Sequence, residues 1–386
     1  MPIPKFKSST TTGPNNVHAE PCIAALEAGK QTIAEKPLAM NVAEARPMVA
    51  AAKAAEINCM NKAAEHEHRP PVMVETVNGP VAPEELGLTD AHTHVWIEPL
   101  DGVSPGSPQL FDQEAIAAEL NDYRLSGGGA LVDCQPGGCG RDGRVLRILS
   151  SASGVHIVAC TGFHLKKYYP PDFWLFRHAV NAGDVAKWFV QEICEGLIES
   201  NDQPQPVRAG FIKASCEATL AATSLGLLDA AAMAAIQTGV AIQVHTEKGA
   251  DAEKIAARFQ RLGLSLNKLI LCHLDKRPDA TLHQELAEAG VILEYDTFYR
   301  EKYDPDNTVW PLLEKMVGLG LVAKIAIGTD MAEPAMWSLL GGGPGQTAYT
   351  GQILARLRRI GIDENNIQQL MGKNIASVLA AKTDKK

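Results

Sequence analysis

Six side chains of types that bind metal ions occupy comparable places in this chain, each at the end of a strand-like segment. They are His92, His94, Lys213, His245, His273 and Asp330. His92 and His94 are two residues apart, so on a strand both point to the same face and can share one cation. A single histidine at a strand end is more often structural. Six such groups at the ends of strands are not expected by chance. We therefore predict the site of a two-metal hydrolase.

Lys213 is the most informative member of this set because it lies in the apolar run from Ala209 to Ala214. An unpaired ammonium would be costly to bury there. If the amine has reacted with CO2, it becomes a carbamate, an oxygen ligand able to bridge two cations, and the burial cost disappears. We predict that Lys213 is carboxylated and that Lys213 and Asp330 both take part in catalysis.

Eight strand–helix units must position these residues. From Val72 onward, apolar runs of strand length alternate with segments of helical periodicity. The predicted strands are Leu88–His94, Gly129–Cys134, His156–Gly162, Ala209–Lys213, Ala241–His245, Leu269–His273, Val291–Tyr295 and Lys324–Asp330. The pattern predicts an α/β fold, a (β/α)8 TIM barrel, whose active site lies at the carboxyl ends of the strands.

Helices are predicted between these strands and after the last one. They include Gln113–Ser126, Asp184–Ser200, Asp251–Leu262, Asp279–Ala289, Pro311–Leu319 and a closing helix, Glu364–Ala381. The first 70 or so residues differ in kind, because a loop, an Ala-rich helix, a short strand and a second helix cannot build much core. We place the domain boundary at Pro70-Pro71, so that residues 1–71 form a short α/β appendage and residues 72–386 the barrel.

A series of motifs runs through the barrel segment. In Thr76–Val95, Gly79–Gly87 leads into His92-Thr93-His94, and the later motifs are Arg208–Lys213, His245-Thr246-Glu247, His273-Leu274-Asp275 and Gly328-Thr329-Asp330. In these motifs and in their order, the segment resembles the phosphotriesterase-like family of the amidohydrolase superfamily. The resemblance covers residues 72–381. Two departures are Thr93, where the family often has Glu, and His164, where relatives often carry an aromatic residue.

The resemblance implies a division of the ligands between two cations. His92, His94 and Asp330 would hold the more buried ion, His245 and His273 the more exposed one, and carboxylated Lys213 would bridge them. Two divalent ions hold a bridging hydroxide at neutral pH, which attacks the substrate while Asp330 takes its proton. Imidazole and oxygen ligands suit zinc best, and manganese, cobalt or iron would fit the same shell.

Basic and aromatic residues in the loops after the strands predict an anionic small-molecule substrate. The candidates for substrate binding are His164, Lys248, Lys276, Arg277, Tyr299 and Lys302. Solvated loops are often charged without a ligand, so this set is an open prediction. The preferred substrate is a lactone, above all a sugar-acid lactone, or a carboxylic ester. A phosphodiester or phosphotriester is the alternative, and a catalytically silent binding barrel is the non-enzyme alternative.

The amino-terminal segment, residues 13–60, resembles the middle of the Gfo/Idh/MocA oxidoreductase family. The similarity rests on Asn15–Glu20, Ala28-Gly29-Lys30 and Glu35–Asn41, which includes that family's Glu-Lys-Pro motif. The glycine-rich turn that would bind the dinucleotide phosphates is missing ahead of this segment, so we expect no working NAD site.

Composition sets limits on the class of protein. The formal net charge is −9 and no basic patch appears, which argues against a nucleic-acid partner. No stretch reaches the roughly 20 apolar residues of a membrane span, and residues 1–12 lack the apolar core of a signal peptide. We expect a cytoplasmic enzyme without a membrane partner, and leave open whether it is a homodimer.

Overall fold

The computed structural model of the chain describes residues 8–11, 19–28, 31–34, 42–54, 59–61, 72–177 and 181–382. The chain divides into two compact units, one of Met1–Pro71 with Asp384–Lys386 and one of Val72–Thr383. Among the described residues, no helix is both long and apolar enough to cross a bilayer.

The first unit contains a small parallel sheet. Its strands are β1 (Ser8–Thr11), β2 (Gln31–Ala34) and β3 (Cys59–Asn61), in that order, and its helices are α1 (Ala19–Glu27) and α2 (Val42–Ala54). Strand β1 was not predicted from the sequence, and the predicted loop at residues 14–18 lies outside the described residues. Both helices carry buried apolar residues, Cys22 and Leu26 in α1 and Met48 in α2.

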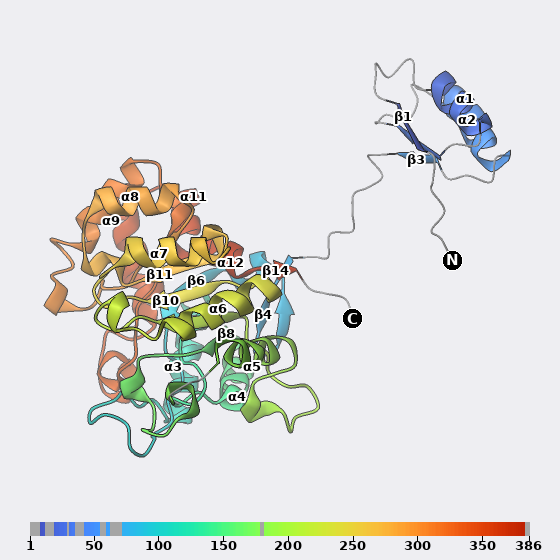
Figure 1. Cartoon of the computed structure of the whole chain (residues 1–386). Helices are drawn as coiled ribbons and strands as arrows, with labels where there is room; N and C mark the ends of the chain where they lie inside the picture. The colour runs from blue at the N-terminus through green and yellow to red at the C-terminus, as the bar shows by residue number, and fades with distance from the viewer. Residues whose placement is uncertain are drawn as a thin grey trace. The chain divides into compact units, whose positions relative to one another are not determined.

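The second unit is a barrel of eight parallel strands, as predicted. They are β6 (Leu88–Thr93), β7 (Gly128–Asp133), β8 (His156–Gly162), β9 (Phe211–Ser215), β10 (Ile242–His245), β11 (Leu269–Cys272), β12 (Ile292–Tyr295) and β13 (Ile325–Ile327). Each pairs with the next in sequence order (Figure 1). The ring is completed where the backbone N–H groups of Thr329 and Asp330 donate to the His92 carbonyl, at 3.1 and 2.7 Å.

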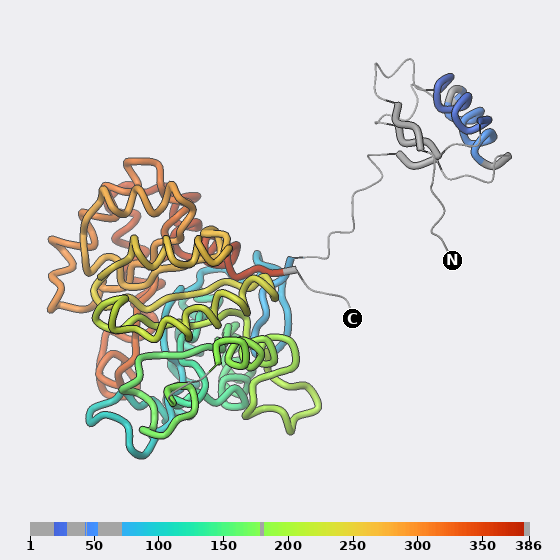
Figure 2. Tube along the Cα trace, in the orientation of Figure 1, coloured from blue at the N-terminus to red at the C-terminus, as the bar shows by residue number. Residues whose placement is uncertain are grey.

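Helices surround the strands, and the tube in Figure 2 follows them around the barrel in sequence order. They are α3 (Gln113–Leu125), α4 (Gly143–Ser153), α5 (Ala182–Cys194), α6 (Leu225–Thr238), α7 (Ala252–Arg261), α8 (Ala280–Glu288), α9 (Val309–Gly318), α10 (Leu354–Arg359), α11 (Glu364–Gln368) and α12 (Asn374–Leu379). Asp112 and Asp279 cap α3 and α8 by accepting backbone N–H groups, which explains where these helices begin.

Several of the predicted elements are shorter in the structure, most clearly the last strand and the closing helix. Strand β13 ends at Ile327 because Gly328 packs against β6, where a Cβ would lie 2.9 Å from the His92 nitrogen. The predicted closing helix is broken into α11 and α12 at Met371 and Gly372. A Cβ on Gly372 would lie 2.3 Å from the Gly87 carbonyl oxygen, so the chain bends where it meets that backbone.

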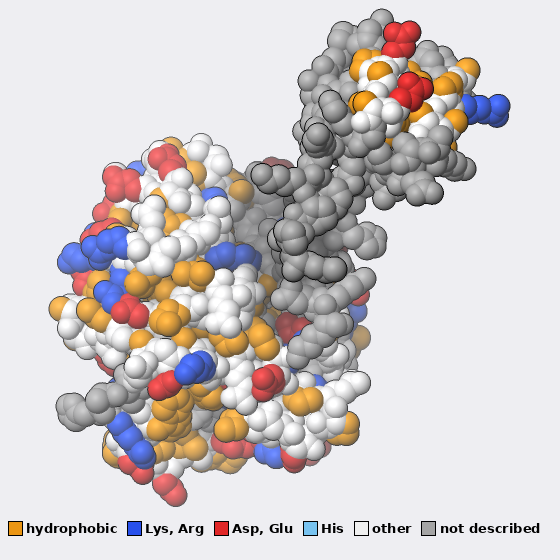
Figure 3. All heavy atoms as spheres, turned by 45° about the vertical axis from the view of Figure 1, so that its right-hand side comes forward, with side chains coloured by type: hydrophobic (Ala, Val, Ile, Leu, Met, Phe, Trp, Pro, Cys, Tyr) orange, Lys and Arg blue, Asp and Glu red, His pale blue; other side chains and the backbone are white. Residues whose placement is uncertain are grey.

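A short sheet joins the beginning and the end of this unit. Strands β4 (Val72–Thr76) and β5 (Gly79–Val81) form a hairpin, and β14 (Ala381–Lys382) pairs antiparallel with β4. The Lys268 ammonium donates to the carbonyl oxygens of Val378 and Ala380, at 2.9 and 2.6 Å, just before β14. In Figure 3, acidic, basic and apolar side chains are interspersed over the visible face of the barrel unit.

The barrel interior changes from apolar to polar along the strands. Small apolar side chains such as Ala130, Val158 and Ile270 fill one end. Because strand residues alternate between faces, Phe211 and Lys213 point to the same side of β9. Lys213 therefore lies above an apolar layer, near the carboxyl ends of the strands.

Candidate metal centre

Three of the predicted ligands form one compact group. His92 and His94 come from the end of β6, and Asp330 lies three residues beyond β13. Asp330 Oδ1 is 3.8 Å from His92 Nε2 and 3.9 Å from His94 Nε2, so the three atoms can face one cation. Both imidazoles are buried and the Asp330 side chain is 13% exposed. Asp330 has a φ of 49°, a left-handed backbone conformation that is uncommon for a non-glycine residue.

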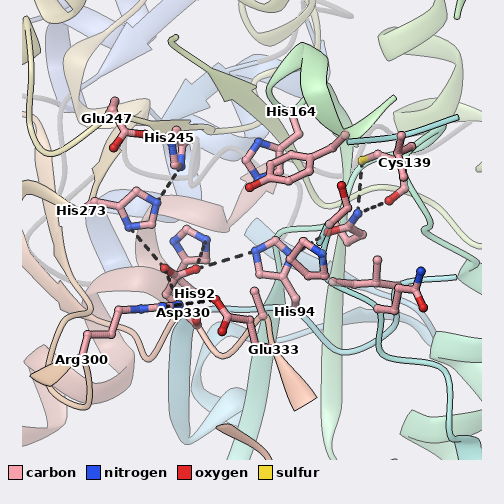
Figure 4. Close-up of a pocket in the computed structure, with 18 of the residues that line it drawn as sticks. His92, His94, Cys139, His164, His245, Glu247, His273, Arg300, Asp330 and Glu333 are labelled. Carbon is pink, nitrogen blue, oxygen red and sulfur yellow. Dashed lines mark hydrogen bonds and ion pairs between the residues drawn. The ribbon is translucent and has the colours of Figure 1, made fainter. Parts of the chain in front are cut away.

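A second pair of imidazoles lies beside this group. His245 ends β10 and His273 follows β11, and His245 Nδ1 is 2.8 Å from His273 Nε2. Figure 4 shows His92, His94 and His273 around the Asp330 carboxylate, with His245 against His273 and Arg300 approaching the carboxylate from the other side. The structure thus brings these five predicted ligands together, and His273 also lies 3.9 Å from Asp330 Oδ2.

Lys213 lies beside the first group, fully buried. Its Nζ is 3.3 Å from His92 Nε2 and 3.9 Å from Cys272 Sγ. Burial acts to lower the pKa of this ammonium, but the neighbouring Cys134, Cys272 and Glu294 raise it, and the balance is a raised pKa. In the unmodified residue, the positive charge of the ammonium would lie beside the His92 imidazole.

The imidazoles have the protonation state that metal binding requires. Burial is the largest cause that lowers the pKa of each, well below the usual value for His92 and to about 4 for His94. Burial also lowers the pKa of His245 and of His273. All four rings are therefore neutral at pH 7 and offer a lone pair to a cation.

Buried partners orient three of these rings. His92 Nδ1 lies 2.7 Å from Glu294 Oε2, and His94 Nδ1 lies 2.7 Å from Gln135 Oε1. His273 Nδ1 contacts Asp296 Oδ2. With Nδ1–H donated to these oxygens, the lone pair of each ring is at Nε2, which faces the site.

Sequence reasoning missed Glu294, Asp296 and Gln135. Glu294 and Asp296 are two residues apart at the end of β12, the same spacing as His92 and His94, and that pattern could have identified them. His92, His273, Glu294 and Asp296 have possible ligand atoms close enough to hold an ion by themselves. Since the Nδ1 atoms on this side are already hydrogen-bonded, we assign Glu294 and Asp296 to orienting the rings.

These observations fit a divalent metal site. Neutral imidazoles and a carboxylate converge, and the described side chains leave several buried polar atoms near them without a hydrogen-bond partner, among them His245 Nε2, Glu294 Oε1 and Asp296 Oδ1. Nitrogen and carboxylate donors of this kind suit zinc and other first-row divalent cations.

Replacement of Glu294 by Ala is expected to weaken metal binding by about 10- to 100-fold, because His92 loses the partner that fixes its ring. Competition with a fluorescent chelator measures this. Glu288→Ala, an exposed carboxylate on α8, is the matched control and should bind metal like the wild type. Equal affinity in Glu294→Ala and the wild type would contradict the orienting role.

A cavity of about 200 Å³ opens over these residues. Of the predicted substrate-binding residues, His164, Lys276 and Lys302 line it, and Arg300 and Tyr303 line it although they were not in the predicted set. The Lys276 side chain is 9% exposed, with Nζ 3.9 Å from Asp330 Oδ2. An Arg300 guanidinium nitrogen lies 3.0 Å from the same oxygen.

Three other predicted substrate-binding residues do not line this cavity. Lys248 is exposed. The Arg277 guanidinium forms an ion pair with the Glu253 carboxylate, at 3.2 Å. The Tyr299 hydroxyl donates to the Ala348 carbonyl at 2.8 Å. The structure thus narrows the predicted set to the residues that face the metal ligands.

Thr93, the residue between the two histidines of β6, faces away from the cavity as predicted and has a structural partner. Its hydroxyl oxygen accepts a hydrogen bond from Gln346 Nε2 at 2.9 Å. The loop that contains Gln346 is held in turn by Glu119, which accepts the backbone N–H groups of Ser338, Leu339 and Gln346 at 3.1, 2.8 and 2.9 Å. The loop after Asp330 is therefore anchored to β6 and α3.

An eight-stranded parallel barrel with a buried histidine and carboxylate cluster at the strand ends defines a metal-dependent barrel hydrolase. The model of the phosphotriesterase family matches residues 72–379, and the chain belongs to this family. As a member, it is a hydrolase that acts on ester bonds. The model of the oxidoreductase family with an NAD-binding Rossmann fold matches residues 9–62, in agreement with the predicted resemblance. The Glu35-Lys36-Pro37 motif lies outside the described residues.

Curated relatives and a solved structure are similar to the barrel. A phospho-furanose lactonase from Mycoplasmopsis agalactiae is 34% identical over 61% of this chain and 69% of its own length. One from Mycoplasmopsis synoviae is 29% identical over 79% of this chain and 91% of its own. The crystal structure of an amidohydrolase from Mycoplasma synoviae superposes with a TM-score of 0.72 at 27% identity, over 82% of this chain and 94% of that one.

Proposed function

We propose that this chain hydrolyses the lactone ring of an anionic sugar acid, with a phosphorylated furanose lactone as the first substrate to test. The observation that carries this proposal is a set of three cationic side chains in the cavity lining, which also contains Glu98, Glu247 and Glu333. Lys276, Arg300 and Lys302 line the cavity in a chain whose formal net charge is −9. The names of the two relatives, phospho-furanose lactonases, support the same substrate class. Such a lactone offers a ring ester to hydrolyse and a separate anionic group to bind.

The residues proposed to hold two cations are those of the two imidazole groups. His92, His94 and Asp330 would hold one, and His245 and His273 the other, with carboxylated Lys213 between them. Zinc suits this set best. Two such cations, when bound, supply a hydroxide nucleophile at neutral pH and polarise the carbonyl oxygen of the ester.

Asp330 is the residue proposed to move the proton. Burial acts to raise the pKa of its carboxyl, but His273 and Arg300 lower it, and the net pKa is below the usual value. Asp330 is therefore a carboxylate at neutral pH. One of its oxygens can accept the proton that is released during attack and deliver it to the ring oxygen as the ester bond breaks.

Lys276 and Arg300 are proposed to hold the anionic group of the substrate. In the structure both face Asp330 Oδ2, and Lys276 Nζ also lies 4.0 Å from Asp296 Oδ1. Once Asp330 serves as a metal ligand, less of its charge is available to these two side chains. Their positive charge can then act on a substrate carboxylate or phosphate, in a cavity where solvent screens it little.

A phosphorylated furanose lactone should have a kcat/KM that exceeds that of a neutral lactone of the same ring size by about 10- to 100-fold, the range expected for one or two charged hydrogen bonds. Lys276→Met should remove most of this preference, chiefly by raising KM for the anionic substrate. Steady-state kinetics on the two lactones at low and high salt measure both effects, and the preference should shrink with salt.

Arg277→Ala provides the matched control, because Arg277 follows Lys276 directly but pairs with Glu253 outside the cavity lining. This variant should keep the wild-type preference. Equal turnover of neutral and anionic lactones would contradict the proposed substrate class. Faster turnover of a phosphodiester or phosphotriester than of any lactone would instead identify a phosphoesterase.

A further inference from the structure

His164 lies at the junction between the two groups of proposed metal ligands. It follows β8 by two residues, is 9% exposed and lines the cavity. Its ring centroid is 6.2 Å from that of His94, in the first group, and 5.2 Å from that of His245, in the second. Figure 4 shows the ring above the space between these two imidazoles. A group at this place could reach a substrate atom held between the two proposed cation sites.

The contacts of Nδ1 indicate which nitrogen of the His164 ring carries the proton. The backbone N–H of Leu165 points at Nδ1 from 2.7 Å, and the Ser215 hydroxyl oxygen lies 2.9 Å from the same nitrogen. A backbone amide nitrogen can only donate, so Nδ1 must accept. A proton on Nδ1 would collide with the amide hydrogen. The neutral ring therefore carries its proton on Nε2, on the edge opposite Leu165 and Ser215.

Further contacts hold the ring in this orientation. The His164 backbone N–H donates to the Tyr169 hydroxyl at 2.9 Å. The Tyr168 ring packs edge-to-face against the imidazole, with centroids 4.8 Å apart. Ser215 is the last residue of β9, two residues after Lys213, so the strand that presents the proposed bridging lysine also fixes His164. The N–H group is thus in place before any substrate arrives, which is the arrangement that makes a hydrogen-bond donor effective in catalysis.

We propose that His164 is a catalytic hydrogen-bond donor, whose Nε2–H stabilises the negative charge that develops on the carbonyl oxygen of the ester. This role rests on the proposed function. When an oxygen nucleophile adds to the carbonyl carbon, the π pair moves to the carbonyl oxygen, and it returns when the bond to the ring oxygen breaks. The proton stays on Nε2 throughout. A neutral donor adds this stabilisation without placing a further positive charge beside two cations, as a lysine would.

Two other roles for His164 conflict with the same contacts. A metal ligand at this position would need a lone pair facing the cavity, but the lone pair of the ring is engaged by Leu165 and Ser215 on the other side. A binding site for the anionic group of the substrate would need a positive charge, which requires protons on both nitrogens. The Leu165 amide opposes the second proton.

Nitrogen-15 NMR of the zinc-loaded, histidine-labelled protein tests the position of the proton directly. The ring signals that disappear in His164→Asn belong to His164. We expect them to show a proton on Nε2 and a lone pair on Nδ1 in the absence of substrate. A proton on Nδ1, or on both nitrogens at pH 7.5, would overturn the proposal independently of any activity.

Kinetics and metal content test the role. His164→Phe keeps a ring but no donor, and should lower kcat for the lactone by about 10²- to 10³-fold, the effect of losing one oxyanion donor. KM and the number of bound cations should change little. His164→Asn, whose side-chain amide can donate, should recover part of the loss. His156→Phe, at the opposite end of the same strand, is the matched control and should behave as the wild type.

The outcomes separate the proposals. If His164→Phe loses one bound cation, His164 is a metal ligand, and the donor role is overturned. If His164→Phe raises KM for the anionic lactone alone and leaves kcat unchanged, His164 belongs to the anion site. That result would also overturn the donor role. Wild-type activity in His164→Phe would refute the donor role while the proposed function stands. A wild-type enzyme that hydrolyses no lactone or ester would refute both.

Discussion

Lys213→Ala is expected to lose nearly all hydrolytic activity, by about three orders of magnitude or more, which corresponds to about 4 kcal/mol of transition-state stabilisation. Lys213 is fully buried, and its Nζ lies 3.3 Å from His92 Nε2. An ammonium there would repel cations held by the surrounding imidazoles, whereas a carbamate would bind them. Removing the side chain should also lower the metal content, which we propose to be two ions per chain, towards one.

Short carboxylic acids should restore part of the activity of Lys213→Ala, because a carboxylate can occupy the space of the missing carbamate. Lys268→Met is the matched control. Lys268 is also a partly buried lysine of the barrel, but its Nζ donates to the carbonyl oxygens of Val378 and Ala380, and the variant should keep its metal and activity. Elemental analysis and lactone turnover measure the outcome. Full activity in Lys213→Ala would refute the bridging role.

The proposed metal ligands could be located from the sequence because their positions depend on local rules. Residues two apart on a strand share a face, and the strands of a parallel barrel all end at the same rim. His92 and His94 therefore had to face the same way. Lys213 was identifiable because a lysine in an apolar run needs a special environment. These arguments use only the period of a strand and the cost of burying a charge.

The spacing of Glu294 and Asp296 could have marked them as candidates, but the sequence could not show which side chain orients which ring. Gln135 reaches His94 because β7 is the neighbour of β6, and Glu294 reaches His92 across the barrel interior. Which acidic or amide side chain meets which ring depends on the stagger of the strands. A Glu in a strand is equally compatible with a solvated face when only the sequence is known.

The basic residues of the loops illustrate the same limit. Arg277 and Arg300 both follow strands, and nothing in their spacing distinguishes them. In the structure Arg300 faces Asp330, whereas Arg277 pairs with Glu253. Loop geometry decides whether a cation faces the cavity, and that geometry is set by contacts such as those of Glu119 with the loop after Asp330.

A buried ion network supports the barrel between β8 and the helices that follow it. Arg141 has a fully buried side chain, and its guanidinium contacts the Glu192 carboxylate at 2.6 Å and the Glu199 carboxylate at 2.7 Å. One further nitrogen donates to the Cys160 carbonyl at 2.6 Å. Thr161 donates to Glu192 from the same strand. Both carboxylates of this network contact the one guanidinium, so removing Arg141 would leave two largely buried carboxylates without a cationic partner.

Arg141→Met is therefore expected to lower the free energy of unfolding of the barrel by about 3 to 5 kcal/mol, the range for breaking a buried ion pair on one side. Denaturant unfolding followed by tryptophan fluorescence measures it.

Burial acts to raise the pKa of Glu199, but Arg141 lowers it below the usual value. A depressed folded-state pKa contributes stability above the unfolded-state pKa, so the difference between wild type and variant should be full at pH 7 and shrink as the pH falls through the range in which glutamate protonates. The triple variant Arg141→Met, Glu192→Gln, Glu199→Gln should recover much of the loss because it leaves no unpaired charge. A loss below 1 kcal/mol in Arg141→Met, or one that does not change with pH, would mean that solvent or rearranged side chains reach these carboxylates and that the network contributes little to the stability of the barrel.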